Sequence, residues 1–332
     1  MIRFAEILTE PRPTNFWTML KQMDVAEVVG VLPRGFMDWR MASIDRPWDY
    51  TPLALYKNMI EEEGLTLSCI EDNPPMDRLR HGAPGADEEL DQVLAFVETL
   101  GKLQIPLWCY NWAASLGWQR TSSRLRGRGG AIVSGYNHSL VREAPPPELG
   151  PVPAEKLWDT LQHFLETVVP VAEKANVKLA IHPDDPPIIP AIRGVARIMN
   201  SVDAYRRLLR LNPSPANGIT LCQGNFTLMT DDLPAVIREL GSTGRVYFVH
   251  FRDVRGTAER FEETFIDEGK TDMAACMRAY RDVDFDGIMR SDHTPTMAGD
   301  EALVPGYSDL GRLHAIGYMA GLRDAVLSEP KI

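Results

Sequence analysis

Four side chains of metal-binding type each stand at the end of a short apolar run: His182, Cys222, His250 and Asp292. Imidazole, thiolate and carboxylate groups can share one first-row divalent ion, although this ligand set does not choose among Mn²⁺, Fe²⁺, Co²⁺ and Zn²⁺. Alone, each residue would be more typical of a buried polar side chain, a small buried thiol or a helix cap. At the ends of four consecutive predicted strands, however, they predict one metal centre.

Two residues close to this set could transfer protons. His293 directly follows Asp292, so its imidazole could act as a general acid or base while the carboxylate binds the ion. Successive strand residues point to opposite faces, so His293 reaches the same site only if the strand has ended before it. Tyr307 follows Pro305 and Gly306 in a predicted turn and could donate a proton or a hydrogen bond, although exposed loop tyrosines are common.

Other polar residues near the predicted ligands could bind a substrate. Arg252 and Arg290 each lie two residues from a predicted ligand, and an arginine there could bind a carboxylate through two hydrogen bonds. Asn111 ends another predicted strand. Asp184 and Asp185 lie in a proline-rich turn, where they could face the site, orient an imidazole ring or simply cap a helix.

The elements that must position these residues alternate along the whole chain. Apolar runs rich in β-branched residues are each followed by a longer segment with helical spacing, which is typical of parallel strands joined by crossover helices. The absence of a glycine-rich phosphate motif after the first run favours a closed barrel over an open doubly wound sheet. We therefore predict an α/β fold, a single (β/α)₈ TIM-barrel domain over residues 1–332. The predicted strands are 2–8, 26–32, 65–70, 105–111, 177–182, 218–223, 245–252 and 287–291, and the predicted helices are 14–24, 52–63, 87–101, 154–175, 201–210, 231–240, 271–282 and 309–327.

Residues 112–153 interrupt this alternation after the fourth strand. Their glycines and prolines predict a loop insertion that overhangs the barrel mouth and contains neither a helix nor a central strand. The segment from Arg120 to Arg128 is basic and could contact a small anion, although a solvated loop is the simpler interpretation.

Composition excludes several classes of protein. The 332 residues carry a formal net charge of −11, which does not suit a nucleic-acid partner. We find no apolar run long enough for a membrane span and no signal-peptide pattern at the start, so we expect a cytoplasmic protein with no membrane partner. The four cysteines form no CxxC pair, so neither a disulfide framework nor a zinc ribbon is indicated. We also expect a homo-oligomer.

Several motifs together resemble the D-mannonate dehydratase family of the xylose-isomerase-like TIM-barrel group. The match runs from about residue 105 to the C-terminus, and its His-Pro-Asp-Asp-Pro-Pro string is the most specific part. The motifs that carry the resemblance are Ile181 to Pro187, Leu221 to Asn225, Val249 to Arg252, Arg290 to His293, Pro305 to Tyr307, Gly311-Arg312 and Gly317-Tyr318.

The resemblance implies a hydro-lyase of carbohydrate metabolism. Such an enzyme would use Mn²⁺ or Fe²⁺ to remove water from D-mannonate, or a related aldonic acid, and form a 2-keto-3-deoxy acid. The family's metal ligands correspond to the four residues given above, and its catalytic pair corresponds to His293 and Tyr307. We keep two alternatives: a sugar isomerase or epimerase on the same barrel, which the cysteine ligand disfavours, and a catalytically silent metal-binding homologue.

The chain also departs from the family pattern in three places. Phe4 to Leu8 replaces a Trp-Tyr-Gly string, and Arg290 to Thr294 has serine where the family has proline. In the segment from Phe261, two family histidines are replaced by Glu262 and Ile266. If these two positions lie beside the distal hydroxyls of the sugar acid, mannonate turnover should be weak and another polyhydroxy or aromatic carboxylic acid should be preferred.

Overall fold

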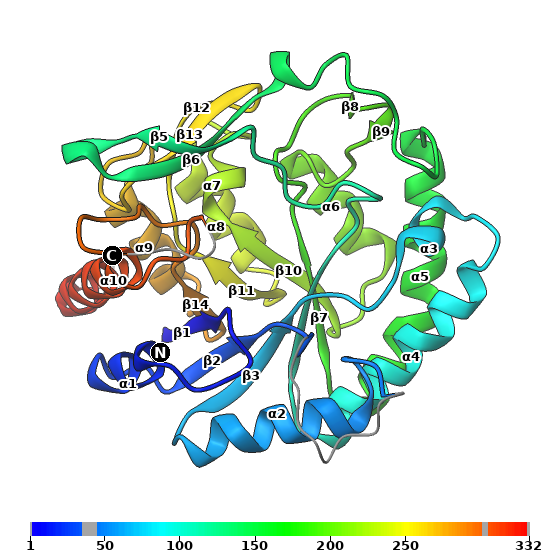
Figure 1. Ribbon diagram of the computed structural model, residues 1–332, viewed down its shortest axis with the longest axis horizontal. Coiled ribbons are helices and arrows are strands. Elements are labelled where there is room, and N and C mark those ends of the chain that lie inside the picture. Colours follow the sequence, from blue (N-terminus) through cyan, green and yellow to red (C-terminus); the bar gives the residue numbers. More distant parts are fainter. Residues whose placement is uncertain (1, 35–44, 301–304, 331–332) are drawn as a thin grey trace.

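The computed structural model describes residues 2–34, 45–300 and 305–330. Within them, eight parallel strands close a barrel in the order β1-β14-β11-β10-β7-β4-β3-β2. The barrel strands are β1 (Arg3–Leu8), β2 (Glu27–Gly30), β3 (Thr66–Glu71), β4 (Leu107–Asn111), β7 (Lys178–His182), β10 (Asn217–Cys222), β11 (Val246–His250) and β14 (Ile288–Arg290). Figure 1 shows helices around the outside of this barrel. The predicted TIM barrel is confirmed.

A helix follows each barrel strand, within about two residues of the predicted bounds at either end. These helices are α1 (Asn15–Gln22), α2 (Tyr50–Glu62), α4 (Ala86–Lys102), α5 (Ala154–Ala175), α6 (Val202–Leu211), α8 (Leu233–Gly241), α9 (Met273–Asp282) and α10 (Asp309–Ser328). The short helices α3 (Asp77–His81), α7 (Gln223–Phe226), η1 (Arg128–Gly130) and η2 (His138–Leu140) were not predicted. No helix in the described part of the chain is long and apolar enough to span a membrane.

Two layers of apolar side chains hold the barrel together. The larger cluster includes Phe96, Phe164 and Leu208 from the helices and Leu179 and Ile219 from the strands. A smaller cluster gathers side chains on the opposite strand faces: Ala5, Ile7, Val29, Cys69, Leu107, Cys109, Ala180, Phe248 and Ile288. Because successive side chains of a strand point to opposite faces, alternate residues supply the two layers. The barrel interior is therefore a packed core.

The insertion after β4 contains strands that the sequence did not predict. β5 (Ser122–Arg126) and β6 (Ile132–Asn137) pair with β12 (Val254–Thr257) and β13 (Arg260–Glu263) in an antiparallel sheet of order β12-β13-β6-β5. This accessory sheet lies at the upper left in Figure 1. A further ribbon joins β8 (Ala191–Ile192) to β9 (Val195–Ala196). The prediction that residues 112–153 contain no central strand is therefore wrong.

The glycines of the insertion explain this error. Gly129 and Gly130 have φ of 63° and 85° in the turn between β5 and β6, a backbone conformation that glycine adopts readily. Gly135 lies inside β6, where an added Cβ would be 2.5 Å from Leu125 Cδ1 and 2.9 Å from the Phe261 carbonyl oxygen. These glycines therefore permit a tight hairpin and close strand packing, whereas their number alone suggested a loop.

Candidate metal and active site

Three predicted metal ligands end three neighbouring barrel strands. His182 ends β7, Cys222 ends β10 and His250 ends β11, where Cys222 and His250 pair in register. Each can offer one ligand atom, and these atoms lie within 4.8 Å of one another. His182 Nε2 lies 3.2 Å from His250 Nδ1. Two imidazole nitrogens that face each other beside a sulfur form a donor set suited to a first-row divalent ion.

Asp292 joins this cluster from the loop after β14. Its Oδ2 lies 3.5 Å from His250 Nδ1 and 3.9 Å from Cys222 Sγ. The same oxygen accepts a hydrogen bond of 2.6 Å from Arg252 Nε. Burial raises the pKa of Asp292, but His293, Arg290 and His250 outweigh it and hold the pKa well below its usual range. The structure thus places Asp292 beside two of the three clustered residues, and the imidazole, thiol and carboxylate groups are of types that suit a first-row divalent ion.

Partners of the two histidines determine which ring nitrogens face the cluster. His182 Nδ1 lies 2.8 Å from the Pro183 carbonyl oxygen, which accepts its hydrogen and leaves Nε2 for the cluster. His250 Nε2 lies 3.3 Å from Glu71 Oε1, so Nδ1 is the ring nitrogen that faces the cluster. Oriented imidazoles of this kind are typical of metal sites. The Pro183 carbonyl, rather than Asp184, therefore orients the His182 ring.

Glu71, at the end of β3, is a site residue that sequence analysis missed, because the predicted strand stopped one residue before it. It pairs through both carboxylate oxygens with Arg290, at 2.9 and 3.0 Å. Burial raises the pKa of Glu71, but Arg290 and His250 outweigh it and lower the pKa to about 2. In turn, burial and Arg290 lower the pKa of His250, but Glu71 and Asp292 raise it to about 9.

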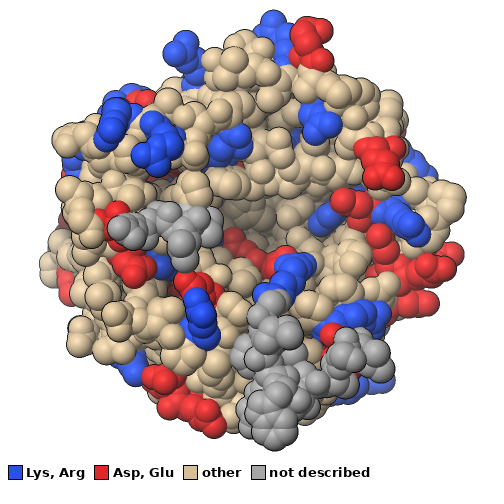
Figure 2. All heavy atoms as spheres, in the orientation of Figure 1, with Lys and Arg blue, Asp and Glu red and all other residues tan. Residues whose placement is uncertain are grey.

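A cavity of about 300 Å³ opens over this cluster at the barrel mouth. Figure 2 shows the face of the molecule hollowed near its centre, with acidic side chains inside the hollow. Gly117 and Trp118, which belong to the insertion, contribute to the wall. The other described lining residues are Glu71, Asp72, Asn73, Cys109, Tyr110, Asn111, Ala113, His182, Pro183, Asp185, His250, Asp292, His293 and Tyr307.

His293 and Tyr307, the predicted proton carriers, both line this cavity. β14 ends at Arg290, so His293 belongs to the following loop and can face the same side as Asp292. Tyr307 Oη donates a hydrogen bond of 3.1 Å to Asp292 Oδ1, and the rings of Tyr307 and His293 meet edge to face. Burial raises the pKa of Tyr307 well above its usual value, so its hydroxyl keeps its proton.

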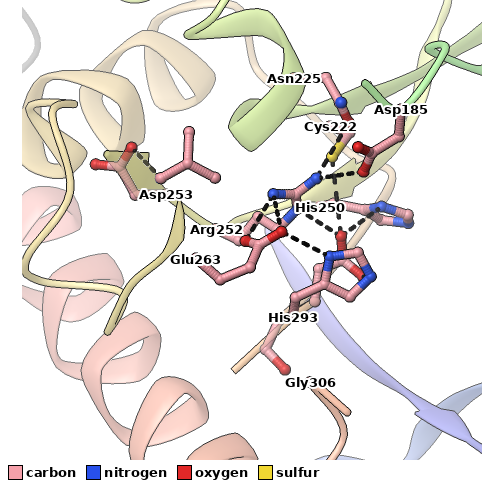
Figure 3. Close-up of polar contacts among 12 residues, drawn as sticks. Asp185, Cys222, Asn225, His250, Arg252, Asp253, Glu263, His293 and Gly306 are labelled. Carbon is pink, nitrogen blue, oxygen red and sulfur yellow. Dashed lines mark hydrogen bonds and ion pairs between the residues drawn. The ribbon is translucent and has the colours of Figure 1, made fainter. Parts of the chain in front are cut away.

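Of the four residues predicted to bind substrate, Asn111 lines the cavity and the other three lie behind its wall. Arg290 is fully buried against Glu71 and Asp292. Arg252 donates to Asp185 and Glu263 (Figure 3), and also to Asp292. Asp184 is 1% exposed and accepts a hydrogen bond from the Met199 backbone N–H. These side chains hold the site's loops in place.

Two charged residues that were not predicted as ligands, proton carriers or substrate-binding groups, Arg120 and Glu263, complete the surroundings of the site. Arg120, from the insertion, donates to Asp185 at 2.6 Å and to Glu263, and its side chain is 4% exposed. Glu263 ends β13 and lies 3.1 Å from His293 Nδ1. Arg252 lies between Asp185 and Glu263, as Figure 3 shows. Arg120 is therefore neither a solvated loop residue nor a free anion ligand.

Glu262 and Ile266 lie away from the cavity, which corrects the expectation about the substrate. Glu262 pairs with Arg255 at 3.4 Å and lines a separate groove beside β6. Ile266 is 5% exposed and packs in the larger apolar core. Neither residue is among the described residues that line the cavity. The two replaced histidines therefore give no reason to expect weak mannonate turnover.

Comparisons with known sequences and structures show the family of this chain. The family model described as D-mannonate dehydratase (UxuA) matches residues 16–151 and 149–331. The mannonate dehydratase of Enterococcus faecalis is 34% identical over 84% of this chain and 86% of its own length. The crystal structure of mannonate dehydratase from Streptococcus suis serotype 2 superposes with a TM-score of 0.88 at 27% identity, and covers 98% of this chain and 93% of that one.

Less similar structures share the fold only. An L-ribulose 3-epimerase superposes with a TM-score of 0.62 at 13% identity, over 98% of this chain and 96% of that one. Likeness at this level does not favour the isomerase or epimerase alternative. The family model, by contrast, spans both the ligand-bearing strands and the loop with His293 and Tyr307. The chain belongs to the D-mannonate dehydratase family and is accordingly a hydro-lyase.

Proposed function

We propose that this protein dehydrates D-mannonate, or a closely related aldonic acid, to the corresponding 2-keto-3-deoxy acid with Mn²⁺ or Fe²⁺ bound. The observation that carries the proposal is that the His182, Cys222 and His250 cluster, with Asp292 beside it, lies at the cavity that His293 and Tyr307 also line. His182, Cys222, His250 and Asp292 would hold the ion.

The reaction requires a proton to leave C2, next to the carboxylate, and a hydroxyl to leave C3. When bound, the divalent ion would neutralise the carboxylate and stabilise the negative charge that develops as C2 loses its proton. His293 and Tyr307 face the same cavity and can divide the two proton transfers. Tyr307, whose burial keeps the hydroxyl protonated, suits the donor role towards the leaving hydroxyl.

The cavity suits a small polyhydroxy acid. Asp72, Asn73 and Asn111 contribute polar groups to its wall, and such groups can pair with sugar hydroxyls. None of the described residues that line it is Lys or Arg. The negative charge of a substrate would therefore be met chiefly by the bound cation rather than by an arginine.

A direct assay tests this proposal against its alternatives. Mn²⁺-loaded protein is incubated with D-mannonate and a panel of other aldonic acids, and 2-keto-3-deoxy products are measured against epimers. We expect dehydration of mannonate with a kcat/KM of about 10⁴ M⁻¹s⁻¹ or more. Epimers without keto-deoxy product would support the epimerase alternative, and no change in any substrate would support a silent homologue.

Assembly into a homo-oligomer remains a prediction, which light scattering can test.

A further inference from the structure

Two charged side chains, one from the insertion and one from the accessory sheet, reach the loop after β14 from outside the barrel. Glu263 comes from β13, and Arg120 comes from the segment just before β5. Both side chains are buried, with 2% and 4% of their surface exposed. Glu263 Oε1 lies 3.1 Å from His293 Nδ1, and Arg120 Nη2 lies 3.2 Å from the same nitrogen. Whether His293 Nδ1 carries a hydrogen therefore depends on which of these two neighbours the nitrogen pairs with.

The hydrogens on Arg120 decide between the two neighbours. Nη2 of an arginine carries two hydrogens and has no acceptor. One is donated to Asp185 Oδ2 at 3.0 Å and the other to Glu263 Oε1. No hydrogen of Nη2 remains for His293. The imidazole must then donate its Nδ1 hydrogen to Glu263, which leaves the lone pair on Nε2.

Ring contacts hold the imidazole in this orientation. The Trp118 ring lies 4.9 Å from the His293 ring at 42°, and the Tyr307 ring meets it at 5.5 Å and 86°. Nε2 lies 3.6 Å from Asp292 Oδ1, too far for a hydrogen bond. With His293 lining the cavity, Nε2 is the ring nitrogen that can meet a substrate proton.

We propose that Glu263 is a positioning residue, which fixes His293 with its hydrogen on Nδ1 and its Nε2 lone pair towards the cavity. The inference rests on the proposed function for its catalytic consequence, but the position of the hydrogen stands independently of it. Arg252 and Arg120 also bind Glu263, so the loop after β11, the insertion and the loop after β14 all contact this carboxylate. Figure 3 shows Glu263 between Arg252 and His293.

A purely structural role for Glu263 is the competing explanation, because its loss leaves two buried arginines short of a partner. The two explanations differ in what they change. A structural ion pair affects unfolding and metal retention, whereas a positioning residue affects kcat and the position of the imidazole hydrogen. The matched control is Glu262→Gln, since Glu262 neighbours Glu263 on β13 but pairs with Arg255 away from the cavity.

The experiment combines imidazole NMR with kinetics. Protein labelled with ¹⁵N-histidine is loaded with diamagnetic Zn²⁺, and the His293 signals are assigned by their loss in His293→Asn. We expect wild-type His293 to carry its hydrogen on Nδ1, and Glu263→Gln to lose this preference. With Mn²⁺ and mannonate, Glu263→Gln should keep its metal content and KM but lower kcat by about 10- to 100-fold. Glu262→Gln should match the wild type in all of these measurements.

Two results would overturn the inference: wild-type His293 with its hydrogen on Nε2, or Glu263→Gln with wild-type kcat. The wild-type spectrum remains decisive even if Glu263→Gln does not fold. Failure of the proposed function can be distinguished from failure of this inference, because the wild type would then dehydrate no aldonic acid. The NMR measurement still tests the contact with Glu263 in that case.

Discussion

His182 Nδ1 hydrogen-bonds to the Pro183 carbonyl and His250 Nε2 lies 3.3 Å from the Glu71 carboxylate, so the other ring nitrogen of each faces the cluster. The ligand residues could be predicted because each ends a recognisable apolar run. The partner of His250 could not, because Glu71 lies 179 residues before it (250 − 71) and is brought to the site only by folding. Strand ends thus identify ligands, while orientation depends on tertiary contacts.

Cys222 is fully buried and should be required for metal binding. We expect Cys222→Ser to lower the metal content sharply, because a serine hydroxyl is a poorer donor than a thiolate for a first-row ion. Metal content is measured on purified protein by elemental analysis. Cys276→Ser is the control, since Cys276 is equally buried but lies on α9 and should keep full occupancy. Normal occupancy in Cys222→Ser would remove the thiol from the site.

His293→Asn should separate metal binding from catalysis. The variant keeps the four ligands, so metal content should be unchanged, while kcat should fall by about 10²- to 10⁴-fold because a proton carrier is lost. His163→Asn on α5 serves as the control and should behave as the wild type. Turnover that persists in His293→Asn would end its assignment as a proton carrier.

Metal affinity should rise with pH, because His250 must lose a proton before it can bind the metal. Glu71 and Asp292 raise its pKa to about 9, so the metal-free protein holds a proton on His250 throughout the neutral range. Metal must displace this proton, which costs up to about tenfold in affinity for each pH unit below the pKa. Competition titrations with a chelating dye between about pH 6 and 8 measure the slope. A flat or falling affinity would contradict this role for His250.

Some helices and strands have a clear periodic pattern of apolar residues, whereas others form only through pairing with distant segments of the chain. The barrel strands and their helices follow apolar patterns that sequence alone displays, and the α5 bounds agree with the prediction. The pairing of β6 with β13 joins Tyr136 to Phe261, which lie far apart in the sequence. No local pattern could indicate that partner, so glycines were interpreted as loop residues.

Gly135 offers a test of that packing. We expect Gly135→Ala to destabilise the protein by about 1–3 kcal/mol, because the new methyl group meets the Phe261 carbonyl and Leu125. Gly321→Ala on α10 should change stability in the opposite direction by about 0.5–1 kcal/mol, since nothing lies within 4 Å and alanine favours a helix. Thermal and urea unfolding measure both. Equal effects of the two substitutions would contradict close packing at β6.

At the scale of the whole molecule, the candidate metal site spans half of the barrel. Its predicted ligands come from β7, β10 and β11 and from the loop after β14, and these four strands are consecutive neighbours in the closed sheet. The next two strands along the sheet, β4 and β3, contribute Asn111 and Glu71 to the cavity. A bound ion would therefore connect four strands whose ends are otherwise joined mainly by hydrogen bonds and ion pairs.

This arrangement predicts that metal removal lowers global stability. A ligand that binds only the folded chain at about 100 times its Kd stabilises it by about 2.7 kcal/mol. For a chain of 332 residues we expect chelation to lower Tm by several degrees, and Mn²⁺ to restore it. Scanning calorimetry of wild type and Cys222→Ser, with and without chelator, checks this. Because Cys222→Ser lacks a ligand, its Tm should respond little to chelation, whereas a response as large as that of the wild type would place the stabilising ion elsewhere.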